Sequence, residues 1–266
     1  MMASHLSLFS GIGGLDLAAE WAGFETVGQC EFADYPTKIL EKHWPDVPRW
    51  RDIRTLTKES FYERTGRRTA AIVSGGFPCQ PHSSNGKRKA SSDERDLWPE
   101  FRRVVSEIAP DWVVAENVRG LLTSDNFRFF GGILRDLADL GYNAGWCCFP
   151  ASWVGAVHRR ERVFIIANSA GRRWGKLDKM QQNGYTGMPT QATAKGAFPA
   201  CNIPFYVDGT FANPISGILR NDDGIPGALD RLKCLGNAVV PQQAYPIFKA
   251  IMEVIIWLSR NQPLPA

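Results

Sequence analysis

Residues 6–14, Leu-Ser-Leu-Phe-Ser-Gly-Ile-Gly-Gly, carry the main information about the fold of this chain. The short apolar run Leu6–Ser10 predicts a strand, the glycines end it, and Leu15–Ala22 is the first predicted helix. In open α/β sheets, a glycine turn between the first strand and the first helix lets the backbone approach a nucleotide-like ligand. The segment therefore predicts the start of an α/β sheet, although the turn alone is equally consistent with a tight loop.

Outward from this turn, apolar runs of strand length alternate with segments of helical spacing. Further strands are predicted at 25–31, 70–74, 112–116, 142–149 and 163–167, and further helices at 36–43, 97–109, 129–140 and 242–258. Because continuously apolar strands alternate with amphipathic helices, we expect a mostly parallel sheet covered on both faces. Residues 170–230 are rich in glycine, proline, asparagine and glutamine, which predicts an irregular region.

The composition excludes several broad classes of protein. The 266 residues allow one large domain or two small ones, and 44% hydrophobic with 22% charged residues exclude disordered and fibrous chains. The six cysteines form no C-x-x-C pair, so we expect no metal site, and free thiols fit a reducing cytoplasm. The net charge of +4 is compatible with nucleic acid as a partner.

Neither end of the chain predicts a targeting or membrane segment. Residues 1–21 lack a basic region and carry acidic residues within their apolar stretch, unlike a signal peptide. The longest apolar stretch, Ala244–Leu258, is interrupted by Lys249 and Glu253 and is too short to cross a bilayer. We therefore expect a cytoplasmic protein without a membrane anchor.

Two acidic residues after the glycine turn bear on the ligand. Glu31 ends the second strand about 20 residues after the glycines, where a ribose hydroxyl is usually bound, although a solvated strand end is the simpler alternative. Asp52 follows the expected third strand, where it could accept from an adenine amino group or be a surface charge. Because no basic residue lies near the turn, a nucleoside without phosphates, such as S-adenosylmethionine, fits better than a nucleotide.

Three further segments carry residues suited to catalysis. Cys79 directly follows a strand in a loop of glycines and prolines, where a reactive thiol is more fitting than a core residue. Glu116, followed by Asn117, ends the next strand, where burial could raise the pKa of the carboxyl and make it an acid, although a structural carboxylate fits equally well. Arg160 and Arg162 lie two residues apart, so an extended segment would present both on one face to a phosphate or carbonyl, or to solvent.

Taken together and in this order, the segments resemble the DNA cytosine carbon-5 methyltransferase family. The resemblance covers roughly residues 5–168 and 231–258, and its motifs are FSGIGG (9–14), GGFPCQ (75–80), ENV (116–118), RRERVFIIA (159–167) and GNAVVP (236–241). His158 stands where the family's arginine motif has a glutamine, and the motif that normally precedes the last one is not found. The resemblance implies a Rossmann-like, S-adenosylmethionine-dependent methyltransferase divided into a catalytic core (1–168), a target-recognition region (169–230) and a C-terminal segment that returns to the core (231–266).

The resemblance also implies roles for particular residues. Cys79 would add to carbon 6 of a flipped cytosine, and Glu116 would hydrogen-bond to or protonate the ring nitrogen. Asn117 would position Glu116 and its loop, and Arg160 would contact the base carbonyl or a nearby phosphate, with Arg162 in support. The residues implied at the cofactor are Phe9, Ser10, Gly11, Ile12, Gly13, Gly14, Glu31, Asp52, Ile53, Pro78, Leu97, Asn237, Ala238 and Val239. Those implied at DNA are Gln80, Ser83, Lys87, Arg88 and Lys89, in a loop that would close over the duplex or, more simply, be solvated surface.

The expected partner is double-stranded DNA, bound by a monomer in the cytoplasm at the nucleoid. Three other interpretations remain open at this point: a methyltransferase acting on cytosine in RNA, a catalytically silent sequence-specific DNA-binding protein, and a nucleotide-dependent oxidoreductase. The last rests on the glycine turn alone and leaves the segment around Cys79 unexplained.

Overall fold

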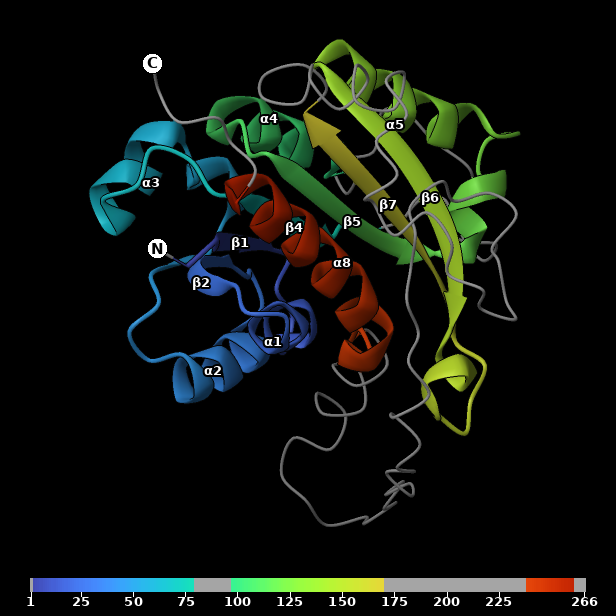
Figure 1. The fold of residues 1–266 in the computed structure, drawn as a ribbon, viewed down its shortest axis with the longest axis horizontal. Helices are drawn as coiled ribbons and strands as arrows, with labels where there is room; N and C mark the ends of the chain where they lie inside the picture. Colours follow the sequence, from blue (N-terminus) through green and yellow to red (C-terminus); the bar gives the residue numbers. More distant parts are fainter. Residues whose placement is uncertain (1, 79–96, 170–237, 261–266) are drawn as a thin grey trace.

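The computed structural model describes residues 2–78, 97–169 and 238–260 (Figure 1). Within these ranges the strands are β1 (Ser4–Leu8), β2 (Glu25–Cys30), β3 (Arg49–Trp50), β4 (Ile72–Gly76), β5 (Trp112–Val118), β6 (Tyr142–Pro150) and β7 (Glu161–Ser169). The helices are α1 (Gly14–Trp21), α2 (Asp34–His43), α3 (Lys58–Thr65), α4 (Trp98–Ile108), α5 (Arg128–Asp139) and α8 (Pro241–Arg260), with short 3₁₀ turns η1 (Ile53–Thr55), η2 (Arg119–Thr123) and η3 (Ala151–Val154).

The strands form one sheet in the order β3-β2-β1-β4-β5-β7-β6. The pairs from β3 to β5 are parallel, whereas β7 runs antiparallel to both β5 and β6. The antiparallel pairing of β6 with β7 follows from their short connection, because a parallel pair needs a crossover of a dozen or more residues. The mostly parallel sheet expected from the sequence is confirmed, with one strand reversed.

Helices cover both faces of the sheet, so alternate residues of a strand enter two different cores. On β5, Val113 and Ala115 pack in the cluster beneath α3, α4 and α5, while Trp112 and Val114 pack in the cluster beneath α1 and α8. Figure 1 shows α8, from the end of the chain, crossing the sheet beside α1. Burial on two faces explains why these strands are continuously apolar in the sequence.

The structure differs from the sequence prediction in its local elements. Helix α3 was not expected, because Phe61 is its one buried side chain and its sequence has little helical periodicity. Its start is instead stabilised by a capping box, in which Thr57 and Ser60 each bind the backbone of the other. Helix α2 begins at Asp34, two residues before the predicted start.

Replacement of Gly75 by alanine is expected to destabilise the sheet. A Cβ at this position would lie 2.6 Å from the carbonyl oxygen of Leu8 and 2.9 Å from the ring of Phe101, both in the core. Overpacking of this kind costs about 1–3 kcal/mol in the free energy of unfolding, which denaturant titration measures. Gly145→Ala is the matched control, because a Cβ on that β6 residue meets no atom within 4 Å. Equal stability of the two variants would contradict the predicted clash.

Candidate active site

The glycine turn lies at the carboxyl end of β1 and is held by hydrogen bonds to the end of β2. The Ser10 amide donates to the Cys30 carbonyl (3.0 Å), and the Gly11 amide donates to the Glu31 carboxylate (2.8 Å). The other oxygen of Glu31 accepts from the Ala33 amide (2.8 Å). Gly13 has a φ of +87°, and a Cβ there would overlap the Trp44 ring at 2.5 Å. The backbone conformation and the close packing both therefore require glycine at position 13.

A buried polar network lies directly behind this turn. Asp16, on α1 and fully buried, accepts hydrogen bonds from the Ser7 hydroxyl and from the Gln29 carboxamide, both at 2.9 Å. Gln29 in turn accepts from Arg49 (2.8 Å). Burial raises the pKa of Asp16 to about 6, although these hydrogen bonds act in the opposite direction. The sequence pattern gave no role to Asp16, but a carboxylate within an otherwise apolar helix face is the signal that could have found it.

The second part of the site is Glu116, near the end of β5. Its side chain forms an ion pair with the Nε of Arg162 on β7 at 2.8 Å, and both side chains are largely buried. The register explains the contact: Glu116 faces Phe164, and Arg162 is the diagonal neighbour on the same face of the antiparallel pair. Burial raises the pKa of Glu116 to about 7, even though Arg162 and Arg160 favour its ionised form.

Asn117 connects β5 to the segment that precedes Cys79. Its side-chain amide donates to the carbonyl of Phe77 (3.0 Å), and its side-chain oxygen accepts from the Val118 amide (2.8 Å). Gly76, at the end of β4, leaves room for the neighbouring carboxylate, because a Cβ there would lie 2.9 Å from an oxygen of Glu116. The ends of β4 and β5 are thus joined beside the glutamate.

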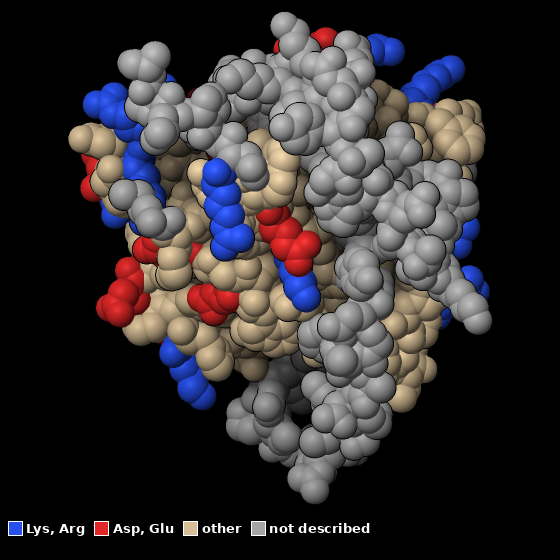
Figure 2. All heavy atoms as spheres, in the orientation of Figure 1, with Lys and Arg blue, Asp and Glu red and all other residues tan. Residues whose placement is uncertain are grey.

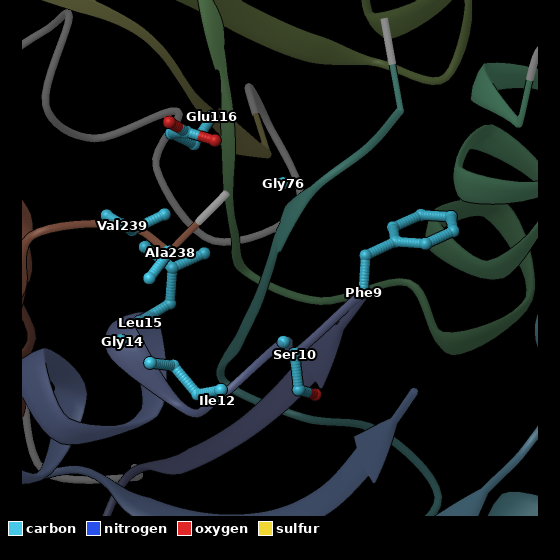
Figure 3. A pocket seen from close by; sticks show the side chains of 10 residues that line it. Phe9, Ser10, Ile12, Gly14, Leu15, Gly76, Glu116, Ala238 and Val239 are labelled. Atoms are coloured by element: carbon cyan, nitrogen blue, oxygen red, sulfur yellow. The ribbon is translucent and has the colours of Figure 1, made fainter. Parts of the chain in front are cut away.

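The C-terminal segment completes the pocket. Arg160, just before β7, donates from its Nη2 to the carbonyl of Ala238 (2.6 Å), and the carbonyl of Val239 lies so close to Gly14 that a Cβ there would be 2.5 Å away. The pocket between these parts, seen in Figure 3, is lined by Phe9, Ser10, Gly11, Ile12, Gly14, Leu15, Gly76, Glu116, Ala238 and Val239. The structure therefore brings the glycine turn, Glu116 and the C-terminal segment to one site.

Other residues predicted for the site lie elsewhere or outside the described ranges. Asp52 caps η1 by accepting from the Arg54 amide (3.0 Å), Ile53 is buried, and Leu97 precedes α4. Pro78 and His158 are exposed, and neither lines the pocket. The predicted residues outside the described ranges are Cys79, Gln80, Ser83, Lys87, Arg88, Lys89 and Asn237.

Two pocket residues were missed by the sequence patterns, and a third residue lies beside Glu31 in the chain. Leu15 and Gly76 line the pocket. Phe32 does not line the pocket, but it follows Glu31 directly and its ring is 77% exposed. In the sequence, its position directly after Glu31, the predicted ribose-binding residue, could have identified it as a candidate neighbour of the ligand.

Three further observations concern the surface charge, metal binding and membrane insertion of the described residues. Figure 2 shows basic and acidic side chains interspersed over the described part of this face, without one continuous basic surface there. Among the described residues, no group of three or more histidine, cysteine or acidic side chains is arranged to hold a metal ion. The described helices also include none with the length and apolar character needed to span a bilayer.

The sheet with its reversed β7 strand, and the pocket beyond the carboxyl ends of its parallel strands, define a Rossmann-like methyltransferase fold. Consistent with this, the model of the C-5 cytosine-specific DNA methylase family matches residues 3–197, well over half of the chain. The chain belongs to this family.

Individual relatives agree with this assignment. The chain is 35% identical over 162 residues to the type II methyltransferase M.FnuDI of Fusobacterium nucleatum (60% of this chain, 45% of that protein). It is 30% identical over 206 residues to M1.HphI of Haemophilus parahaemolyticus (76% and 54%). A crystal structure described as a DNA modification methyltransferase encoded within an Escherichia coli prophage matches with a TM-score of 0.55 and 27% identity (63% and 47%). The chain thus spans about half the length of these relatives.

Proposed function

We propose that this protein transfers a methyl group from S-adenosylmethionine to carbon 5 of cytosine in duplex DNA. One observation carries the proposal: the buried Glu116, which is paired with Arg162, lines the same pocket as the glycine turn. A carboxyl group whose pKa lies near 7 can donate a proton or hydrogen bond to a ring nitrogen at neutral pH. The pocket therefore combines a nucleoside-type turn with an acid suited to a nucleobase.

The residues around the turn fit the cofactor. A Cβ at Gly11, whose φ is +56°, would meet no atom within 4 Å, so a ligand can approach the backbone there. Glu31 is already fixed by two amides and keeps lone pairs for ribose hydroxyl groups, and the exposed Phe32 ring can stack on the adenine. Bound S-adenosylmethionine supplies an electrophilic methyl group. The neutral, glycine-rich backbone suits such a cation better than a phosphate.

The chain's own residues would activate the cytosine once it is flipped out of the duplex. The Cys79 thiolate forms a bond to carbon 6, while Glu116 hydrogen-bonds to the ring nitrogen and stabilises the charge that develops. Carbon 5 then takes the methyl group, loses its proton to a base, and the bond to Cys79 breaks to release the thiolate. Asn117 holds the segment before Cys79 through Phe77, and Arg162 keeps the Glu116 carboxyl in place.

Binding of the duplex would involve Gln80, Ser83, Lys87, Arg88 and Lys89. Basic residues in this segment would neutralise phosphates, so the affinity for DNA would fall steeply as salt rises. Residues 169–230 would read the target sequence, and the protein would act as a cytoplasmic monomer associated with the nucleoid. The alternative substrate is cytosine in structured RNA, since the same chemistry serves either nucleic acid.

The test is methyl transfer from labelled S-adenosylmethionine to duplex DNA, to the same duplex with every cytosine replaced by 5-methylcytosine, and to structured RNA. We expect label in the first substrate alone. Label in RNA and none in the DNA would replace the proposed substrate. Cofactor binding, measured by calorimetry, without transfer to any of these substrates would support a catalytically silent DNA-binding protein.

A further inference from the structure

Gln243, in the first turn of α8, contacts the end of β6 and the residue before β7, both far from it in the sequence. Its side chain is fully buried, and its Nε2 donates to the carbonyl of Phe149 at the end of β6 (2.6 Å) and to the carbonyl of Arg160 just before β7 (3.1 Å). Among the described residues its Oε1 has no hydrogen-bond partner. Leaving this oxygen unsatisfied costs free energy, and both hydrogen bonds of the side chain are donated by Nε2. The donor end of the carboxamide therefore makes the stabilising contacts.

Arg160 is held in an unusual conformation by these contacts. Its φ is +26°, outside the regions that residues other than glycine commonly adopt, so the surrounding structure must maintain it. The C-terminal segment holds Arg160 at both ends: Gln243 binds its carbonyl and the Ala238 carbonyl accepts from its guanidinium (2.6 Å). The Nε of Arg160 is buried and has no hydrogen-bond partner within the described ranges.

The position of the Arg160 guanidinium matters because of Glu116. The charged groups that act on Glu116 from the described elements are Arg162 on β7 and Arg160 just before it, and both lower the pKa that burial has raised. Gly76 of β4 and Ala238 of the C-terminal segment also line the pocket, and neither carries a charge. Arg162 is paired directly with the carboxylate, whereas Arg160 depends for its place on the C-terminal segment.

We propose that Gln243 is a positioning residue for methyl transfer, because its carboxamide holds the backbone of Arg160 and so keeps that guanidinium near Glu116. This inference rests on the proposed function for its catalytic meaning. The start of α8 would then have two roles: it covers the sheet, and through Gln243 it keeps the Arg160 guanidinium near the Glu116 carboxyl.

The test is Gln243→Met, which keeps the length of the side chain and removes both donors, with Gln242→Met as the matched control on the neighbouring, half-buried residue. The first readout is the pKa of Glu116, followed by NMR titration of protein with ¹³C-labelled glutamate and assigned with Glu116→Gln. We expect Gln243→Met to raise this pKa by about half a unit to one unit, since an attractive charge moves away, and Gln242→Met to leave it unchanged.

The second readout is methyl transfer. We expect Gln243→Met to lower kcat about tenfold at every pH, because the Arg160 guanidinium is no longer held in place at the site. The alkaline limb of the pH–rate profile should move upward with the pKa, and the KM for S-adenosylmethionine should stay within about twofold. An unshifted pKa and pH profile, or the same shift in Gln242→Met, would overturn the proposal. If wild-type protein transfers no methyl group but the pKa shifts, the proposed function fails and the positioning of Arg160 stands. Should Gln243→Met not fold, Gln243→Asn retains the donor but withdraws it by one methylene, and a smaller shift in the same direction is expected.

Discussion

Replacement of Glu116 by glutamine is expected to lower the rate of methyl transfer by about 10²–10⁴-fold, the usual contribution of a positioned general acid. The carboxyl is buried, paired with Arg162 at 2.8 Å and open to the pocket, so no other described acidic side chain can replace it there. Glutamine preserves the shape and can donate one hydrogen bond, but it cannot transfer a proton. Steady-state assays with saturating cofactor and duplex DNA measure the loss.

The pH dependence of the rate provides a second test of the role of Glu116. The pKa of Glu116 is raised to about 7, and the protonated form is the donor, so the rate should fall as the pH rises through about 7. In Glu116→Gln this alkaline limb should disappear, because the amide keeps its hydrogens at every pH. Glu161→Gln is the matched control: Glu161 neighbours Arg162 on β7 but pairs with Arg119 and Arg159 near the surface. A Glu161→Gln variant with the same loss of activity would contradict the role given to Glu116.

Replacement of Cys79 by alanine is expected to abolish methyl transfer, with a loss on the order of 10⁴-fold or more, since removal of a nucleophile leaves only binding and electrostatic stabilisation. Cofactor binding should remain, because the glycine turn and Glu31 make no use of the thiol. The measurement is the same labelled assay, together with calorimetric titration of S-adenosylmethionine.

A covalent trap tests the same step independently. Duplex DNA carrying 5-fluorocytosine at the target should form a denaturation-resistant adduct with the wild-type protein and none with Cys79→Ala. Cys148→Ala is the control, because Cys148 is a partly exposed free thiol on β6 and does not line the pocket. An active enzyme that forms no adduct, or an adduct that survives in Cys79→Ala, would exclude addition of this thiol to carbon 6.

The order of strands and helices could largely be predicted from the sequence. Apolar runs such as the one in β5 are continuous because both of their faces are buried, and this pattern is visible along the chain. Helix α3 could not be predicted, because a capping box and a single buried Phe61 leave little periodicity. The brief β3 strand escaped a defined range for a similar reason, since two residues make no pattern.

Some features of the site could likewise be predicted from the sequence, and others could not. The glycine turn and the residues at the ends of β2, β4 and β5 are local features, because each depends on a few neighbouring residues and on where a strand stops. The pairing of Glu116 with Arg162 depends on the register of an antiparallel pair 46 positions apart in the chain, and no local pattern specifies it. The spacing of Arg160 and Arg162 predicted that both lie on one face, but the structure pairs Arg162 with Glu116 and Arg160 with the Ala238 carbonyl.

The sequence by itself therefore determined which segments form the strands and turns of this α/β chain, because the periodicity of burial and the needs of tight turns are written in neighbouring residues. Only the tertiary structure determined which charged and polar groups contact one another. Asp16 behind the turn, Arg160 beside Ala238, and Gln243 between β6 and the start of β7 all depend for their partners on the packing of α1, α8 and the segment before α8 on the sheet. Electrostatic energies depend on distance and burial, and both are set by the folded arrangement and not by the order of residues.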